Sequence, residues 1–152
     1  MIQHSRKPAA VILLLMLGLS TLLVLDRRTL ARGADDTELA ALQLAIAQPD
    51  AKTQTWLKYA QKLQAVGQPR HAAMAYRRVL AAEPYNRIAR LNGAICLAKA
   101  GQADDFYTFM HDTVLIDPKL AVDVFERPEA QAFLSEPRFQ ALSREAQVQS
   151  MD

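Results

Sequence analysis

The chain has 152 residues, a length that suits one compact domain. A single Cys excludes an internal disulfide framework and a Cys-rich zinc site, and 22% charged residues are too many for a polytopic membrane protein. The charge is unevenly divided. Residues 1–34 carry five basic residues and one acidic residue, whereas residues 35–152 carry 13 basic and 15 acidic residues. The net charge of +2 therefore comes from the N-terminal segment.

Residues 9–25 read AAVILLLMLGLSTLLVL and contain no charged residue. At 1.5 Å per residue, a helix of this length spans about 26 Å, at the short end for crossing a bilayer. Basic residues flank both ends, as is typical of side chains among lipid headgroups. We predict an uncleaved transmembrane signal anchor at Ala9–Leu25, between a basic tail at 1–8 and a polar linker at 26–36. A cleaved signal peptide and a buried core helix are the alternatives.

Because the flanking basic charges are nearly balanced, they do not orient this segment by themselves. A short basic tail before a first apolar segment is typical of an N-terminus that stays in the cytoplasm. We therefore predict a single-pass protein with its N-terminus cytoplasmic and its C-terminal domain across the membrane.

The rest of the chain contains an internal repeat with a period of 34 residues. Identical pairs at this offset are Leu57/Leu91, Ala60/Ala94, Leu63/Leu97, Gly67/Gly101, Gln68/Gln102 and Pro84/Pro118. A period of this length is typical of stacked helical hairpins. Apolar residues recur at helical spacing on both sides of Gly67-Gln68-Pro69, where Gly suits a helix end and Pro a helix start. Both copies, about 53–86 and 87–120, are predicted to fold as helix, tight turn, helix.

Five residues of the first copy stand at a recognisable spacing: Trp56, Ala60, Ala72, Tyr76 and Pro84. They resemble the tetratricopeptide repeat (TPR) family. The second copy matches less well, with Arg90 where the family has Trp, Gly93 in place of a large residue and Phe106 in place of a small one. We expect Phe106 to fill the space that Gly93 leaves, which would conserve core volume.

Two repeats cannot bury both ends of a solenoid, so capping helices are expected. Helical patterns at about 37–47 and 119–146 would supply them, and 147–152 would form a frayed tail. No strand pattern persists. The predicted fold is all-α, with an N-terminal single transmembrane helix followed by a short TPR-like α-solenoid of antiparallel helix hairpins over 37–146.

Residues that could carry chemistry are scattered. The three histidines fall on separate predicted elements without metal-ligand spacing: His4, His71 and His111. Cys96 lies between apolar residues in a predicted helix, which favours a packing role. There is no Gly-rich phosphate loop and no nucleophile elbow. We therefore predict that the protein is not an enzyme and has no catalytic residue, metal site, cofactor or small-molecule substrate. The slightly acidic body also argues against nucleic-acid binding.

The TPR resemblance implies that the first helix of each hairpin lines a groove for an extended or helical peptide. The candidate groove residues that it implies are Gln54, Leu57, Lys58, Gln61, Gln64, Ile88, Leu91, Asn92, Ile95 and Lys99. They would form a mixed apolar and amide surface. The Lys and Asn set with which chaperone-binding members clamp a terminal carboxylate is matched here only by Asn92.

These features favour a membrane-anchored TPR-like adaptor, a protein–protein interaction scaffold that assists assembly of an envelope complex. TPR proteins of bacterial cytochrome c maturation, secretion and pilus assembly are similar in arrangement. The alternative is a structural accessory subunit held in a membrane complex by its single transmembrane helix. Both hypotheses predict a protein or peptide partner, contact with the lipid bilayer through Ala9–Leu25, and an inner (cytoplasmic) membrane location with the C-terminal domain periplasmic or extracytoplasmic.

Overall fold

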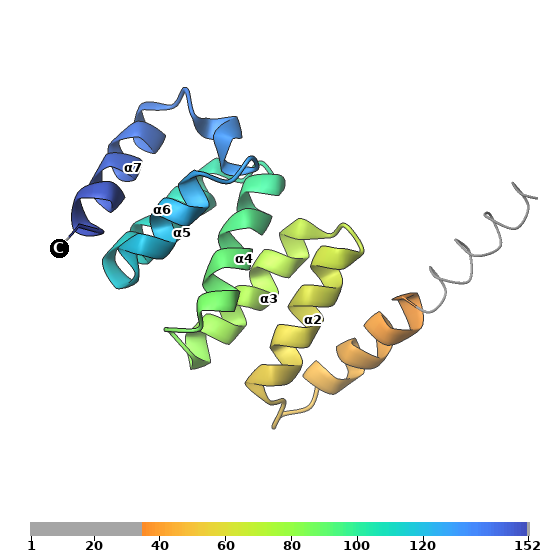
Figure 1. The fold of residues 1–152 in the computed structure, drawn as a ribbon. Coiled ribbons are helices and arrows are strands. Elements are labelled where there is room, and N and C mark those ends of the chain that lie inside the picture. The colour runs from red at the N-terminus through yellow and green to blue at the C-terminus, as the bar shows by residue number, and fades with distance from the viewer. Residues whose placement is uncertain (1–34, 152) are drawn as a thin grey trace, which may run out of the picture. The chain divides into compact units, whose positions relative to one another are not determined.

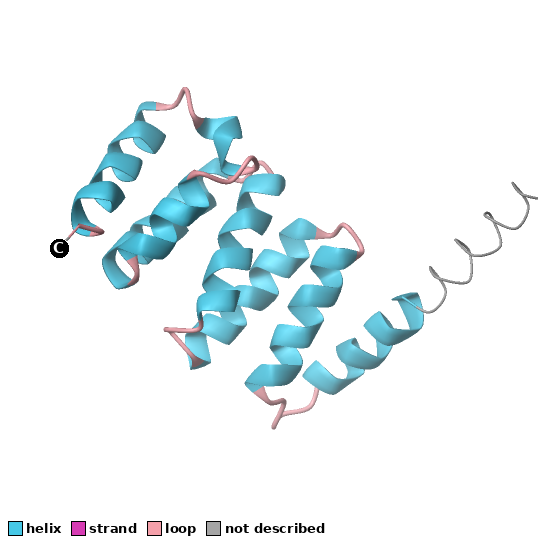
Figure 2. Ribbon diagram, viewed as in Figure 1, coloured by secondary structure: helices cyan, strands magenta, loops and turns pink. Residues whose placement is uncertain are grey.

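The computed structural model describes residues 35–151, and the regular structure in that range is helical (Figures 1 and 2). Residues 35–46 are helical, although residues 35 and 36 were predicted as linker. The helices that follow are α2 (Thr53–Ala65), α3 (Pro69–Ala82), α4 (Arg87–Lys99), α5 (Ala103–Ile116), α6 (Pro118–Phe125), the 3-10 helix η1 (Ala130–Phe133) and α7 (Pro137–Gln149). These elements belong to one compact unit that begins at Leu39.

The predicted fold class needs a correction. The all-α part of the prediction holds for the described residues, but no helix among them has the length and apolarity needed to cross a bilayer. The described helices have polar, exposed faces as well as buried ones, as in Lys58 and Gln61 of α2. The segment Ala9–Leu25, for which the transmembrane helix was predicted, lies outside the described residues, as do the basic tail 1–8 and linker residues 26–34.

The two hairpins turn in the same way. After α2, Gly67 has φ +77°, and the amide of Gln68 donates to the carbonyl of Leu63 over 2.8 Å. After α4, Gly101 has φ +65°, and the amide of Gln102 donates to Leu97 over 3.1 Å. Positive φ suits glycine because it has no Cβ, and these bonds satisfy the last helical carbonyls. The repeat spacing in the sequence therefore corresponds to a repeated helix end.

Helix starts use different local devices. Pro occupies the first turn of α3, α6 and α7, where its missing N–H is not needed. Asn86 begins α4 by accepting a hydrogen bond from the amide of Ala89 over 3.0 Å. Asp117 begins α6 by accepting one from Leu120 over 2.9 Å. Each cap satisfies an amide that the helix itself leaves unpaired.

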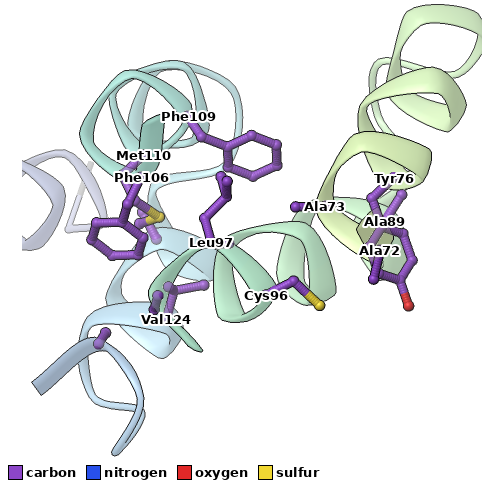
Figure 3. Close-up of a cluster of buried hydrophobic side chains, with 14 of the residues drawn as sticks. Ala72, Ala73, Tyr76, Ala89, Cys96, Leu97, Phe106, Phe109, Met110 and Val124 are labelled. Atoms are coloured by element: carbon purple, nitrogen blue, oxygen red, sulfur yellow. The ribbon is translucent and has the colours of Figure 1, made fainter. Parts of the chain in front are cut away.

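The helices pack in chain order. Helix α3 contacts α2 and α4, and α5 contacts α4, α6 and α7. In Figure 1, α4 crosses in front of α3 and α6 crosses in front of α5. Buried side chains from α2 to α7 form one apolar cluster. Figure 3 labels members of this cluster from α3 to α6.

The C-terminal elements cover the second hairpin with aromatic side chains. The ring centroids of Phe106 and Phe133 are 5.1 Å apart, and those of Phe125 and Phe139 are 5.0 Å apart. These rings join α5, η1, α6 and α7 into one packed end. Helix α7 continues to Gln149, into the range predicted as a frayed tail.

The expectation that Phe106 fills the space beside Gly93 is wrong, because Phe109 does so. A Cβ added at Gly93 would lie 3.0 Å from Phe109 Cζ and 3.3 Å from Tyr76 Cβ. Figure 3 shows the rings of Phe106 and Phe109 on different sides of α5. The two positions differ by three in the sequence, but the Phe106 ring lies beside Phe125 of α6 and the Phe109 ring lies beside Gly93 of α4. An aromatic ring of α5 therefore fills the space beside Gly93, as conservation of core volume requires. That ring belongs to Phe109 and not to the predicted Phe106.

A double-mutant cycle tests this packing. Gly93→Ala adds a methyl group against Phe109, an overpacking that costs about 1–3 kcal/mol and opposes a gain in helix propensity of about 1 kcal/mol. Replacing the Phe109 ring by the smaller Leu side chain should relieve the contact with the added methyl group. Urea unfolding should therefore give a coupling energy of about 0.5 kcal/mol or more between these two changes. The matched pair Gly93→Ala with Phe106→Leu should be additive, and equal coupling in both cycles would contradict the assignment.

Candidate functional site

The structure divides the predicted groove residues by exposure. Leu57 and Ile95 are buried, so their side chains pack inside the protein and leave little surface for a ligand to contact. Gln64, Leu91 and Asn92 are half-buried. The exposed members are Gln54, Lys58, Gln61, Ile88 and Lys99. We call the exposed and half-buried members on α2 and α4, apart from Lys99, the α2/α4 face; its residues are Gln54, Lys58, Gln61, Gln64, Ile88, Leu91 and Asn92.

Tyr76 links the two helices of this face from behind. It belongs to α3 and its side chain is fully buried, yet its hydroxyl donates a hydrogen bond to Gln64 Oε1 over 2.8 Å. Burial raises the pKa of this hydroxyl, the nearby Cys96 thiol adds to the rise, and a side-chain hydrogen bond with Asn92 opposes it. Gln64 of α2 therefore bonds to the hydroxyl of a tyrosine from α3, and Asn92 of α4 lies near the same hydroxyl. The sequence identified Tyr76 only as one of the residues that carry the TPR resemblance and did not connect it with the face.

Three polar side chains along α2 have no hydrogen-bond or ion-pair partner in the part of the chain that the structure describes: Gln54, Lys58 and Gln61. Their spacing of four and three residues puts them on one side of the helix. Ile88 adds an exposed apolar side chain on α4, with 52% of its surface accessible. The face thus offers amide donors and acceptors, one ammonium group and an apolar contact.

Lys99, the remaining candidate, has a different partner. Its Nζ lies 3.3 Å from Glu129 Oε1 of the segment before η1. The pKa of Glu129 is lowered, first by a hydrogen bond from its own backbone amide and then by Lys99. Lys99 therefore ties α4 to the C-terminal elements and stands apart from the α2/α4 face.

A second surface feature lies on the other helices and was not found from the sequence. A hollow of about 480 Å³ opens between α3 and α5, and Arg90 of α4 lies against it. Only 5% of Arg90 is exposed. Arg90 stands 34 residues after Trp56, at the equivalent position of the repeat. This change from Trp to Arg was the feature of the sequence that could have indicated an unusual environment.

The structure places Cys96, His71 and His111, which the sequence analysis considered for chemistry, among the described residues. No group of three or more His, Cys, Asp or Glu side chains in residues 35–151 is placed to hold a metal ion. Burial raises the pKa of the Cys96 thiol to about 11, so it stays protonated at neutral pH and is a poor nucleophile. His71 and His111 are exposed on α3 and α5.

Comparison of the chain with protein-family models, curated proteins and solved structures gives no match.

Tyr76→Phe tests how much the Tyr76 hydroxyl contributes to the free energy of unfolding. The change keeps the buried ring but leaves the half-buried Gln64 without its donor, which should cost about 0.5–1.5 kcal/mol in urea unfolding. Tyr85→Phe is the matched control, because 81% of Tyr85 is exposed and its stability should not change. Equal effects of the two substitutions would show that the Tyr76 hydroxyl contributes nothing specific.

Proposed function

We propose that this protein is a non-enzymatic, TPR-like adaptor that holds a segment of a partner protein along the α2/α4 face. The observation that carries the proposal is the row of Gln54, Lys58 and Gln61, exposed and without partners in the described residues. Amide side chains in such a row can pair with the backbone of an extended peptide, since they both donate and accept hydrogen bonds. Ile88 would give an apolar anchor beside them.

The rigidity of the face also supports this function. Leu57 lies beneath the α2 row and is buried, and the Tyr76–Gln64 hydrogen bond ties α2 to α3. A surface set by packed helices loses little conformational freedom when a ligand binds, so more of the contact energy appears as affinity. The 34-residue repeat of the sequence, with its resemblance to TPR proteins, agrees with a binding role.

The proposal includes a location beside a membrane, in assembly of an envelope complex. This part rests only on the apolar, charge-free residues 9–25. Confinement to a surface would raise the local concentration of the adaptor for partners on that surface.

Co-purification tests the proposed face. The tagged full chain is recovered from detergent-solubilised membranes as wild type and as the triple variant Lys58→Ala, Gln61→Ala, Asn92→Ala. The triple variant should lose at least about tenfold of a partner that the wild type enriches, since several contacts are removed together. Quantitative mass spectrometry measures the enrichment.

The matched control replaces three exposed side chains elsewhere: His71→Ala and Arg78→Ala on α3 and Lys119→Ala on α6. It should keep the partner. If the Lys58, Gln61 and Asn92 variant retains every partner at the wild-type level, the face is not the binding site and the accessory-subunit alternative gains support.

A further inference from the structure

Arg90 is a buried cation with incomplete hydrogen bonding. Its Nη2 donates to the carbonyl of Pro84 over 2.6 Å, and its Nη1 reaches Thr113 Oγ1 at 3.5 Å. Its Nε is buried and has no acceptor among the described residues. A guanidinium group carries five N–H donors, so these two neutral acceptors leave much of its capacity unused. Unmet hydrogen bonding of a buried charge is costly and is usually relieved by an anion.

The nearby carboxylates do not complete the pair. Burial lowers the pKa of Arg90, and coulombic attraction from Asp112 and Asp117 only opposes that effect. Asp117 is already engaged, since one oxygen caps α6 at Leu120 and the other lies 3.1 Å from Arg87 Nε. Asp112 lines the hollow, but its side chain is 66% exposed and Arg90 forms no ion pair with it.

The hollow beside Arg90 is apolar on its sides. Leu80 of α3 and Phe109, Leu115 and Ile116 of α5 contribute to its lining. Leu115 and Ile116 are 61% and 39% exposed, which is high for apolar residues so close together. A volume of about 480 Å³ lies within the range of sites that bind small ligands or single side chains.

Charges at the rim partly cancel. Arg77 Nη2 lies 2.8 Å from Asp105 Oδ1, which bridges α3 and α5 at one side of the hollow and neutralises that aspartate. Asp112 at the rim has no Lys or Arg at ion-pair distance among the described residues, and its nearest basic group is His111, whose Nδ1 lies 3.9 Å from Asp112 Oδ1. An entering anion would therefore be attracted by Arg90 and repelled by Asp112.

We propose that the hollow between α3 and α5 binds a carboxylate carried on a short aliphatic chain, with Arg90 pairing the carboxylate and Leu80, Phe109, Leu115 and Ile116 enclosing the chain. Two sources share this chemistry: a free aliphatic acid, and a Glu side chain of a partner protein. The site is separate from the α2/α4 face and does not depend on the function proposed for that face.

The test titrates the full chain with pairs of probes that differ only in charge. Because residues 9–25 are apolar, all titrations use one non-ionic detergent. The first pair is hexanoate and hexanamide. The second is acetyl-Ala-Glu-Ala-amide and acetyl-Ala-Gln-Ala-amide. Chemical shifts of the Leu115 and Ile116 methyl groups report binding in the hollow. Wild type should prefer the charged member of at least one pair by about tenfold, as a hydrogen-bonded ion pair with a buried arginine predicts.

Two variants and one control variant test the roles of the charges. Arg90→Met should abolish the preference for the charged probe, whereas Arg127→Met, an exposed arginine outside the hollow, should preserve it. Asp112→Asn should strengthen binding of the charged probe severalfold, because it removes the repelling carboxylate. If Arg90→Met fails to fold, the change in affinity for the charged probe on Asp112→Asn tests the proposal by itself.

The outcomes separate the sources. A preference for hexanoate alone identifies a free acid as the ligand, and a preference for the Glu peptide identifies a partner side chain. Equal binding of charged and neutral probes in both pairs, or weaker binding after Asp112→Asn, overturns the proposal. Neither result bears on the α2/α4 face, whose test uses different residues.

Discussion

The burial of Tyr76 is the constraint that holds the first three helices of the repeat region in place. Its ring is fully enclosed between α2, α3 and α4, and its Cβ lies 3.3 Å from where a side chain on residue 93 would begin. Gly93 permits that approach, and Phe109 of α5 fills the remaining space. The far end of the tyrosine reaches Gln64. One side chain therefore connects core packing with the surface of the α2/α4 face, so changes in the core are felt at the face.

The two hairpins have the same order of helix, turn and helix. One pair of equivalent positions differs in polarity between them. In the first hairpin the pair is Trp56 and Val79, both apolar, whereas 34 residues later it is Arg90 and Thr113. Arg90 is 5% exposed and Thr113 is fully buried, so the second hairpin carries a polar contact where the first is apolar. Burying a charge is unfavourable unless it is paired. This cost is concentrated beside the hollow between α3 and α5, which makes that hollow chemically distinct from the remaining surface.

The C-terminal elements stabilise the repeat region and also occupy part of its surface. Phe133 and Phe139 close the open end of the second hairpin, and Glu129 binds Lys99. As a result, the C-terminal end of α4 is engaged within the chain, whereas the amides of Gln54 and Gln61 on α2 remain exposed. The α2/α4 face and the hollow share no residue, although both include residues of α4.

The sequence alone determined the helical hairpins, because helix periodicity, Gly67 and Gly101 at the turns and Pro at helix starts are local signals that survive without tertiary information. Gln54, Lys58 and Gln61 were named only through the TPR resemblance, and the structure shows that all three are exposed on α2. Sequence reasoning was wrong where contacts between different helices determine how a side chain packs. Phe106 and Phe109 differ by three residues on one helix, and only the packing of α4 and α6 around that helix determined which ring meets Gly93. Likewise, an arginine in a helical pattern reads as a surface residue, and only the closure of α3, α4 and α5 around Arg90 buried its charge.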